Sequence, residues 1–136
     1  MQSKFNMTKE QNIFVAKRNI VDYIYKSAKL EGIHITFPET KAIFEGVGVE
    51  GVKVEDIVTI NNLKRAWNFV LDTLDQACDF DYLCRVNMII GTDGNIYGAG
   101  KIRAYDVRIT GTKWRPQIPF EYDIRSEMLD THNERF

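Results

Sequence analysis

A stretch of helical periodicity near the amino terminus constrains the fold of this chain more than any other feature. Aliphatic and small residues recur there at steps of three and four, which places them on one face of an α-helix. Thr8 and Gln11 form a capping-box pattern before the stripe, and Gly32 is a natural stop after it. The sequence therefore predicts an amphipathic helix of about six turns over residues 8–32. Its stripe consists of Ile13, Ala16, Ile20, Ile24 and Ala28, widened by Val21 and Tyr25.

A short second helix is predicted directly after the first. Thr36 and Glu39 repeat the capping-box pattern, and Pro38 suits a first helical turn. This helix should end near Gly46. The glycine-rich segment 46–51 that follows also contains valines, so it does not indicate a linker between domains.

Two further helices are predicted in the middle of the chain. Apolar residues keep helical spacing from Val54 to about Ala77, which predicts the second long helix. Another helix is predicted from Tyr82 to Ile90. Asp79 and Asp81 fit exposed positions at a helix terminus at least as well as a catalytic pair.

The pattern changes after residue 91. Residues 105–114 alternate with a period of two around Thr110-Gly111, which predicts a short β-hairpin. Pro116 and Pro119 bracket a rigid connector, and a last helix is predicted to begin within residues 120–130.

Together these signals predict a mainly α fold, a helical bundle with one inserted β-hairpin, in a single domain over residues 1–136. Strands and helices do not alternate along the chain, so a dinucleotide-binding parallel-sheet fold is disfavoured. The length of 136 residues suits one domain, and 44% apolar residues are typical of a globular protein.

Charge and hydropathy argue against several classes of partner. The formal net charge is −1, so no overall basic excess indicates nucleic acid. No apolar run approaches the roughly 20 residues of a membrane-spanning helix. The first residues, MQSKFNMTKEQN, are polar and lack the apolar segment of a signal peptide. We therefore expect a cytoplasmic protein without a membrane or direct nucleic-acid partner.

Glycines near residue 100 do not form a phosphate-binding loop. Gly94 and Gly100 enclose five residues rather than the required four. Ile102 follows Lys101 at a position where such loops need Ser or Thr.

Metal ligation is not predicted either. Cys78 and Cys84 lack the spacing of a metal site, and we expect two thiols on or near a helix, one or both of them buried. The two histidines, His34 and His132, are too few for a multi-histidine site.

The sequence SAKLEGI, residues 27–33, ends the first predicted helix and raises a question about charge. Glu31 lies in the last turn, where the negative end of the helix dipole disfavours a carboxylate by about 0.3–1 kcal/mol. Ser27 and Glu31 are four residues apart and share one helix face. Glu31 is either a surface residue paired with a nearby lysine or a carboxylate kept there for function.

Two separated stretches together resemble the Fic family (Fic/Doc, Fido). Residues 27–32 fit its inhibitory pattern of Ser or Thr, three residues, Glu, and Gly or Asn; residues 33–36, IHIT, continue as in members with an N-terminal inhibitory helix. GAGKIR at 98–103 and DVRITGTKWRPQIP at 106–119 are similar to the family's flap and its proline-rich exit, here residues 95–119. The resemblance covers about residues 8–130.

The resemblance implies a protein adenylyltransferase, which uses ATP and Mg²⁺ to transfer AMP to a hydroxyl group of a target protein (AMPylation). The flap would hold a target segment by strand-like pairing, because a hairpin edge offers unpaired N–H and C=O groups to an extended peptide. A plain hairpin that packs on the helices is the alternative. The implied flap residues are Val107, Arg108, Ile109, Thr110, Gly111 and Thr112.

The resemblance also implies a regulatory role for the end of the first helix. Glu31 would be the blocking carboxylate, which pairs with an active-site arginine and thereby obstructs placement of the ATP γ-phosphate. Ser27 would assist from one helical turn earlier, and Gly32 would end the helix.

The family's catalytic signature does not occur in these 136 residues. It consists of His, Pro-Phe or similar, an acidic residue, Gly-Asn-Gly-Arg and a further Arg, and His132 in THNERF does not match it. The general base, the phosphate-binding nest, the metal carboxylate and the arginine partner of Glu31 are therefore missing. We predict no catalytic residue, no metal ligand and incomplete binding of ATP and Mg²⁺ by this chain alone.

Three interpretations follow. The chain is the N-terminal regulatory and target-docking part of a Fic-type enzyme, inactive on its own. Or it is a free-standing regulator, such as an antitoxin-like inhibitor of a Fic partner in a toxin–antitoxin pair. Or it is an unrelated helical domain. Under the first interpretation, apolar faces around Ile20, Trp67 and Leu74 stay partly exposed, and the chain associates with itself or with a chain that supplies the catalytic motif.

Overall fold

The computed structural model of the chain describes residues 6–94, 97–119 and 124–129. The chain divides into two compact units, Met1–Asp75 and Gln76–Phe136. Among these described residues, the first unit has three helices, and the second has one helix, a one-turn 3₁₀ helix, a long loop over 97–119 and a helical turn at 124–129. The elements are α1 (Lys9–Leu30), α2 (Phe37–Phe44), α3 (Val54–Asp72), α4 (Phe80–Ile90) and η1 (Thr92–Gly94).

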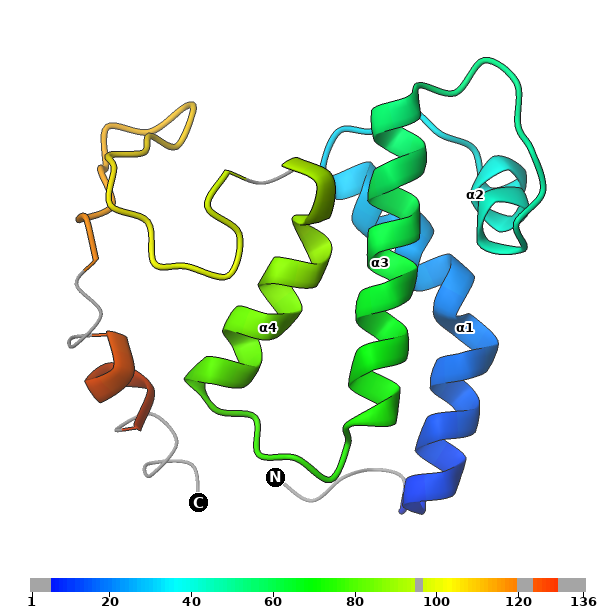
Figure 1. Cartoon of the computed structure of the whole chain (residues 1–136), viewed down its shortest axis with the longest axis horizontal. Helices are drawn as coiled ribbons and strands as arrows, with labels where there is room; N and C mark the ends of the chain where they lie inside the picture. Colours follow the sequence, from blue (N-terminus) through cyan, green and yellow to red (C-terminus); the bar gives the residue numbers. More distant parts are fainter. Residues whose placement is uncertain (1–5, 95–96, 120–123, 130–136) are drawn as a thin grey trace. The chain divides into compact units, whose positions relative to one another are not determined.

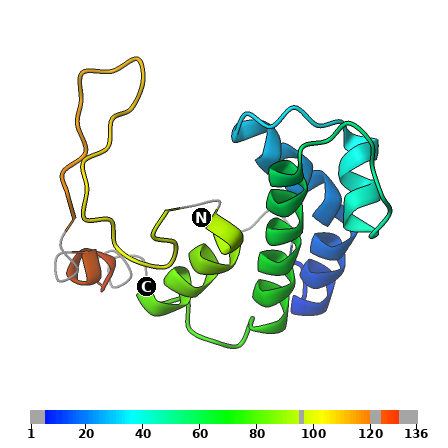
Figure 2. The same ribbon diagram turned by 45° about the horizontal axis from the view of Figure 1, so that its top comes forward.

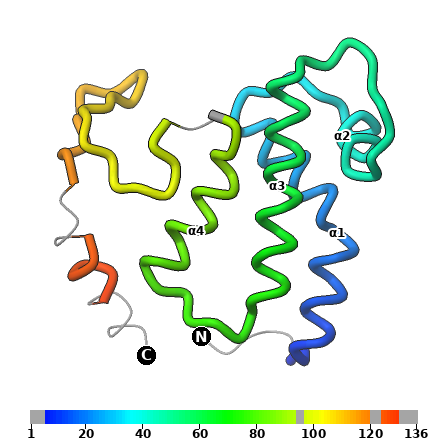
Figure 3. Tube along the Cα trace, in the orientation of Figure 1, coloured from blue at the N-terminus to red at the C-terminus, as the bar shows by residue number. Residues whose placement is uncertain are grey.

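The helices of the first unit pack against one another around an aliphatic core. Figure 1 and Figure 3 show α1 and α3 side by side, with α2 near the carboxyl end of α1. Ile24 and Ile60 are fully buried at the centre of this core, and Trp67 packs against its edge. Of the predicted stripe of α1, Ile20, Ile24 and Ala28 enter this core, whereas Ile13 and Ala16 are half-buried. Ile35 and Ile43 complete the core from the residues that follow α1.

Both predicted capping boxes form and define where α1 and α2 begin. The Thr8 hydroxyl accepts the amide of Gln11 (3.1 Å), and the Thr8 amide donates to the Gln11 side chain (2.9 Å). The Thr36 hydroxyl and amide donate to the Glu39 carboxylate at 2.7 and 3.0 Å. These bonds hold the pKa of the Glu39 carboxyl below its ordinary value.

Aromatic and cationic contacts join the three helices outside the aliphatic core. Tyr23 stacks on Trp67 with ring centroids 5.4 Å apart, which ties α1 to α3. The Lys64 ammonium of α3 donates to the carbonyl of Phe44 (2.6 Å) and lies 4.7 Å from the centroid of its ring, so it caps the last turn of α2. Lys9 and Asp75 form an exposed ion pair.

In the second unit, α4 begins two residues earlier than predicted. The carboxylate of Asp79 accepts the amide of Tyr82 (2.8 Å), so Asp79 is the N-cap and the helix starts at Phe80. Arg125 from the helical turn at 124–129 donates to Asp81 (2.9 Å), and its guanidinium lies 4.5 Å from the ring centroid of Phe80. These contacts attach the turn to the first residues of α4.

Most predicted helices are confirmed, and the chain is mainly α. The second long helix is shorter than predicted, because Thr73 leaves the helical conformation and its hydroxyl donates to the carbonyl of Phe69 (2.6 Å). The last predicted helix is helical at 124–129, and its flanks at 120–123 and 130 lie outside the described residues. Ile20 is buried, contrary to the expected exposure, whereas Trp67 is half-buried and Leu74 is exposed. Cys78 is exposed and Cys84 is half-buried, so the expected burial of a thiol is wrong.

The predicted β-hairpin is not confirmed. Within the described residues 97–119, no strand is assigned, although a turn forms at Thr110-Gly111 as predicted. In a hairpin closed by this turn, Arg108 and Lys113 would lie directly opposite each other, and like charges in that position destabilise strand pairing.

We predict that Ile24→Ala lowers the free energy of unfolding by about 3 kcal/mol, because it leaves a cavity in the core of the first unit. Leu30→Ala is the matched control on the same helix: Leu30 is 89% exposed, and its loss should cost less than about 0.5 kcal/mol. Urea unfolding followed by circular dichroism measures both values. Equal losses for the two variants would contradict the core described above.

Candidate functional site

The carboxyl end of α1 is a Schellman turn built on glycine. Glu31 is the C-cap, with φ −79° and ψ 2°, and Gly32 follows with φ +79°. The amide of Gly32 donates to the carbonyl of Lys29, and the amide of Ile33 to the carbonyl of Ala28, both at 3.0 Å. A side chain at residue 32 would strain this left-handed backbone, so glycine fixes the point at which α1 ends.

This turn leaves the Glu31 side chain exposed at the end of the helix. Ser27 is partly buried one turn earlier, and its carbonyl accepts the Glu31 amide at 3.1 Å. In the part of the chain that the structure describes, no lysine or arginine pairs with Glu31; nearby Lys26 pairs with Asp22 instead (2.8 Å). Glu31 is therefore a carboxylate available to a cation on another molecule or segment.

The end of α2 repeats the same local structure. Glu45 is its C-cap, with φ −81° and ψ −2°, and Gly46 has φ +79°. The amide of Gly46 donates to the carbonyl of Ile43 (3.0 Å), and that of Val47 to the carbonyl of Ala42 (2.8 Å). Glu45 is also exposed. Two glutamates thus occupy equivalent caps, and only Glu31 has a serine four residues before it.

The loop that contains the candidate flap is anchored on α4. The amide of Gly100 donates to the side-chain oxygen of Asn87 at 2.8 Å. Gly100 has φ +78°, and a Cβ atom there would lie 2.8 Å from the Cβ of Met88 and 3.1 Å from the carbonyl oxygen of Cys84. The backbone of the loop therefore approaches α4 as closely as only glycine permits.

Beyond this anchor, the loop runs out and back as two limbs (Figure 2). Arg103 joins the limbs: its guanidinium donates to the carbonyls of Tyr105 (2.9 Å) and Gln117 (2.5 Å). At the far end, the Thr112 amide donates to the Ile109 carbonyl (3.3 Å). None of the backbone hydrogen bonds within the described residues 97–119 runs between the limbs. Since the peptide groups of 106–108 make no backbone hydrogen bond to other described residues, they can pair with an external partner.

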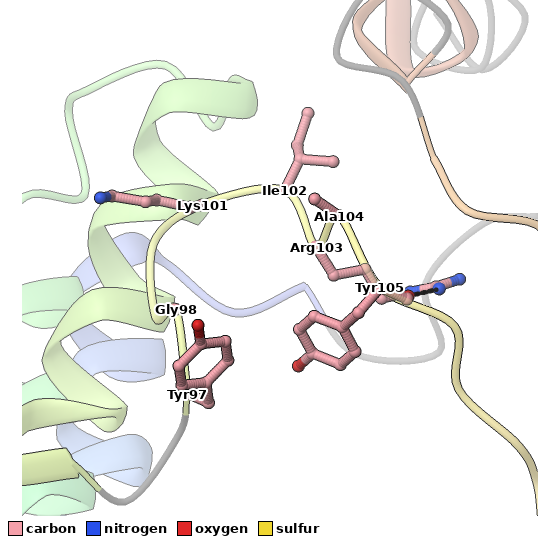
Figure 4. A pocket seen from close by; sticks show the side chains of 7 residues that line it. All are labelled: Tyr97, Gly98, Lys101, Ile102, Arg103, Ala104 and Tyr105. Atoms are coloured by element: carbon pink, nitrogen blue, oxygen red, sulfur yellow. Dashed lines mark hydrogen bonds between the residues drawn. The ribbon is translucent and has the colours of Figure 1, made fainter.

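A hollow lies at the base of the first limb. It has a volume of about 800 Å³ and is lined by residues 97–98 and 101–105. The rings of Tyr97 and Tyr105 have their centroids 5.8 Å apart, and their planes are inclined at 59°. Figure 4 shows both rings on the same side of the backbone, with the Lys101 and Arg103 side chains extending away in opposite directions. Tyr97 is 84% exposed, so most of its ring is free to contact a ligand.

The loop is also the most basic part of the chain. Residues 97–119 contain five basic residues and one acidic residue, Asp106, and therefore carry a net charge of +4. The other 113 residues contain 13 basic and 18 acidic residues, a net charge of −5. The basic residues of the loop are Lys101, Arg103, Arg108, Lys113 and Arg115.

The structure places the sequence-derived candidates as two groups. Ser27, Glu31 and Gly32 lie together at the end of α1, in the first unit. The flap candidates Val107–Thr112 lie along the loop of the second unit, where Val107 is partly buried and the others are exposed. The hollow and the charge of the loop were missed from sequence. Summing charge over segments of about 20 residues, rather than over the whole chain, would have revealed the charge of the loop.

No metal-binding group emerges from the described residues: nowhere among them do three or more His, Cys, Asp or Glu side chains lie close enough to hold an ion. None of the helices among these residues is long and apolar enough to cross a membrane. Comparison with protein-family models, with curated proteins and with solved structures finds no match to this chain.

We predict that Gly100→Ala destabilises the chain more than Gly111→Ala. Both residues have a positive φ, so each variant carries a conformational cost of about 1 kcal/mol. Only at Gly100 does the added methyl group meet another element, whereas nothing lies within 4 Å at Gly111. The crowding should add about 1–3 kcal/mol to the loss in unfolding free energy. Equal losses in urea unfolding would show that the loop is not anchored at Gly100.

Proposed function

We propose that this chain is the regulatory and target-docking part of a Fic-type protein adenylyltransferase, with Glu31 as its inhibitory carboxylate. The observation that carries the proposal is the exposed Glu31 at a helix end set by Gly32, with Ser27 one turn before it and no ion-pair partner among the described residues. The second support is the loop over 97–119, whose sequence resembles the family's flap and whose backbone is open to pairing.

In this proposal, Glu31 acts by competing for an arginine. The guanidinium of the catalytic motif is a bidentate donor that would otherwise bind the γ-phosphate of ATP. When Glu31 takes this donor, the nucleotide lacks a contact that orients it for attack by the target hydroxyl. Gly32 fixes where the helix ends and therefore fixes the position of the Glu31 carboxylate.

The loop serves to hold the target. Peptide N–H and C=O groups of residues 106–108 can pair with an extended segment, and this pairing does not depend on the segment's sequence. The anchor at Gly100 and the Arg103 contacts to Tyr105 and Gln117 hold the two limbs in place. The loop therefore does not need to order itself fully upon binding, which favours affinity.

In this proposal, the chain does not bind ATP and Mg²⁺ in full by itself, because the family's catalytic signature does not occur in its sequence. The catalytic segment must supply the general base, the phosphate contacts and the metal ligand.

The proposal is tested by fusing this chain to a Fic catalytic segment that has its own HPFxxGNGRxxR motif but no inhibitory helix. AMP transfer is measured with α-labelled ATP and Mg²⁺. Glu31→Gln should raise AMP transfer about 10- to 100-fold, because it removes the charge of a hydrogen bond worth roughly 1.5–3 kcal/mol. Glu45→Gln is the matched control, since it neutralises the equivalent cap of α2, and it should leave the rate unchanged.

Two results of this experiment would count against the proposal. One is an equal increase for Glu31→Gln and Glu45→Gln, which would indicate a general charge effect. The other is full activity of the unmodified fusion protein, which would show that the α1 end does not inhibit.

For the isolated 136-residue chain, we predict no AMP transfer. It should label neither itself nor proteins of a cell lysate when incubated with α-labelled ATP and Mg²⁺, because it lacks the catalytic signature. Labelling that requires only this chain would refute its assignment as the non-catalytic part of the enzyme.

A further inference from the structure

We propose that the loop over 97–119 selects an acidic segment, rich in Asp and Glu, in extended conformation. The inference rests on the proposed function in one respect: it names the chemistry of the target that the same loop would dock. It is carried by the loop's charge, its open backbone and the hollow beside it.

The loop and the rest of the chain carry net charges of opposite sign. The loop has a net charge of +4 while the rest of the chain has −5, so the field around the loop has the opposite sign to the field around the remainder. Lys101, Arg108, Lys113 and Arg115 are all exposed. Among the described residues, none of these four has a carboxylate partner. A segment of opposite charge would therefore gain contacts without first breaking ion pairs in the loop.

The positions of these cations match an extended partner. Arg108, Lys113 and Arg115 flank the turn at Thr110-Gly111, and Lys101 lies near the base of the first limb. A strand that paired with the open peptide groups of 106–108 would run along this limb, between the cations at its two ends. Alternate side chains of such a strand point to the same face, so acidic residues at every second position would meet them.

The hollow provides a place for one side chain of the bound segment. It lies at the base of the same limb, and the rings of Tyr97 and Tyr105 form part of its wall. The two hydroxyl groups are hydrogen-bond donors that suit a carboxylate, and the ring faces suit its methylene carbons. A glutamate side chain has both features.

A basic loop with exposed aromatic rings also resembles a surface for single-stranded nucleic acid. The open peptide groups favour a peptide, because strand addition uses backbone N–H and C=O groups that a nucleic acid cannot pair with in register. Arg103, moreover, is engaged by carbonyls within the loop rather than presented to a phosphate chain.

The full 136-residue chain is titrated into a fluorescent twelve-residue peptide in which Glu alternates with Val or Thr, and anisotropy is measured. A peptide with Gln in place of every Glu is the first comparison, and a twelve-nucleotide oligo-dT is the second. We expect the acidic peptide to bind about tenfold more tightly than the Gln peptide at low salt, and the preference to shrink as salt is raised. We also expect the oligonucleotide to bind more weakly than the acidic peptide.

Matched variants test whether the preference for the acidic peptide comes from the cations of the loop. Combined replacement of Lys101, Arg108, Lys113 and Arg115 by Gln should abolish the preference for the acidic peptide. Replacing four exposed cations of the first unit by Gln changes the net charge equally and should preserve the preference. These control positions are Lys17, Arg18, Lys41 and Lys53. Circular dichroism of each variant verifies that the fold is retained.

Several outcomes would overturn the inference. Equal affinity for the acidic and Gln peptides would remove the charge selectivity. Tighter binding of oligo-dT would assign the loop to nucleic acid instead. Unchanged binding of two acidic peptides, one N-methylated at every Glu and the other at every Val or Thr, would exclude strand pairing, because successive N–H groups of a strand point to opposite edges.

Failure of this inference and failure of the proposed function can be told apart. If the Glu31→Gln fusion transfers AMP but the acidic preference is absent, only the target chemistry is wrong. If the loop prefers the acidic peptide but no fusion is affected by Glu31, the loop is a binding surface outside a Fic-type enzyme.

Discussion

The left-handed turn at Gly32 is the constraint on which the candidate regulatory site depends. It ends α1 at a fixed residue, and it lets the next residues turn back so that Ile35 enters the core while Glu31 remains in solvent. If the helix continued through residue 32, both the burial of Ile35 and the exposure of Glu31 would change. Core packing and the placement of the carboxylate therefore have one common cause.

The equivalent turn at Gly46 separates the features that both helix ends share from those found only at Glu31. A glutamate before a glycine at a helix end recurs in this chain and needs no functional explanation by itself. The helix-dipole cost that made Glu31 unusual is small and applies equally to Glu45. What distinguishes Glu31 is its context: Ser27 one turn earlier, and a second stretch that resembles the Fic flap.

Local signals account for what the sequence predicted correctly. Capping boxes at Thr8 and Thr36 and glycines at 32 and 46 act within a few residues, so the bounds of α1 and α2 could be predicted. The end of α3 could not, because Leu74 continues the apolar pattern while the Thr73 hydroxyl competes for the Phe69 carbonyl.

The loop depends on contacts between residues distant in sequence, and prediction was weakest there. Alternation around Thr110-Gly111 indicated a hairpin. The described contacts that hold the limbs are instead the hydrogen bond from Arg103 to the Gln117 carbonyl and the close packing of the Gly100 backbone against α4. Neither follows from a period-two pattern. The candidate residues Ser27, Glu31 and Val107–Thr112 were found by resemblance. The hollow required the structure, whereas the segregated charge required only a charge count over segments of the sequence.

The central claim is that Glu31 inhibits by pairing with an arginine of a catalytic segment. A double-mutant cycle tests it most directly: AMP transfer is measured for the fusion protein, for Glu31→Gln, for the final arginine of the HPFxxGNGRxxR motif replaced by Lys, and for both changes together. We predict a coupling free energy of about 1–3 kcal/mol, because each change removes the same contact. Additive effects of the two changes would show that Glu31 and the arginine act independently, and would contradict the account.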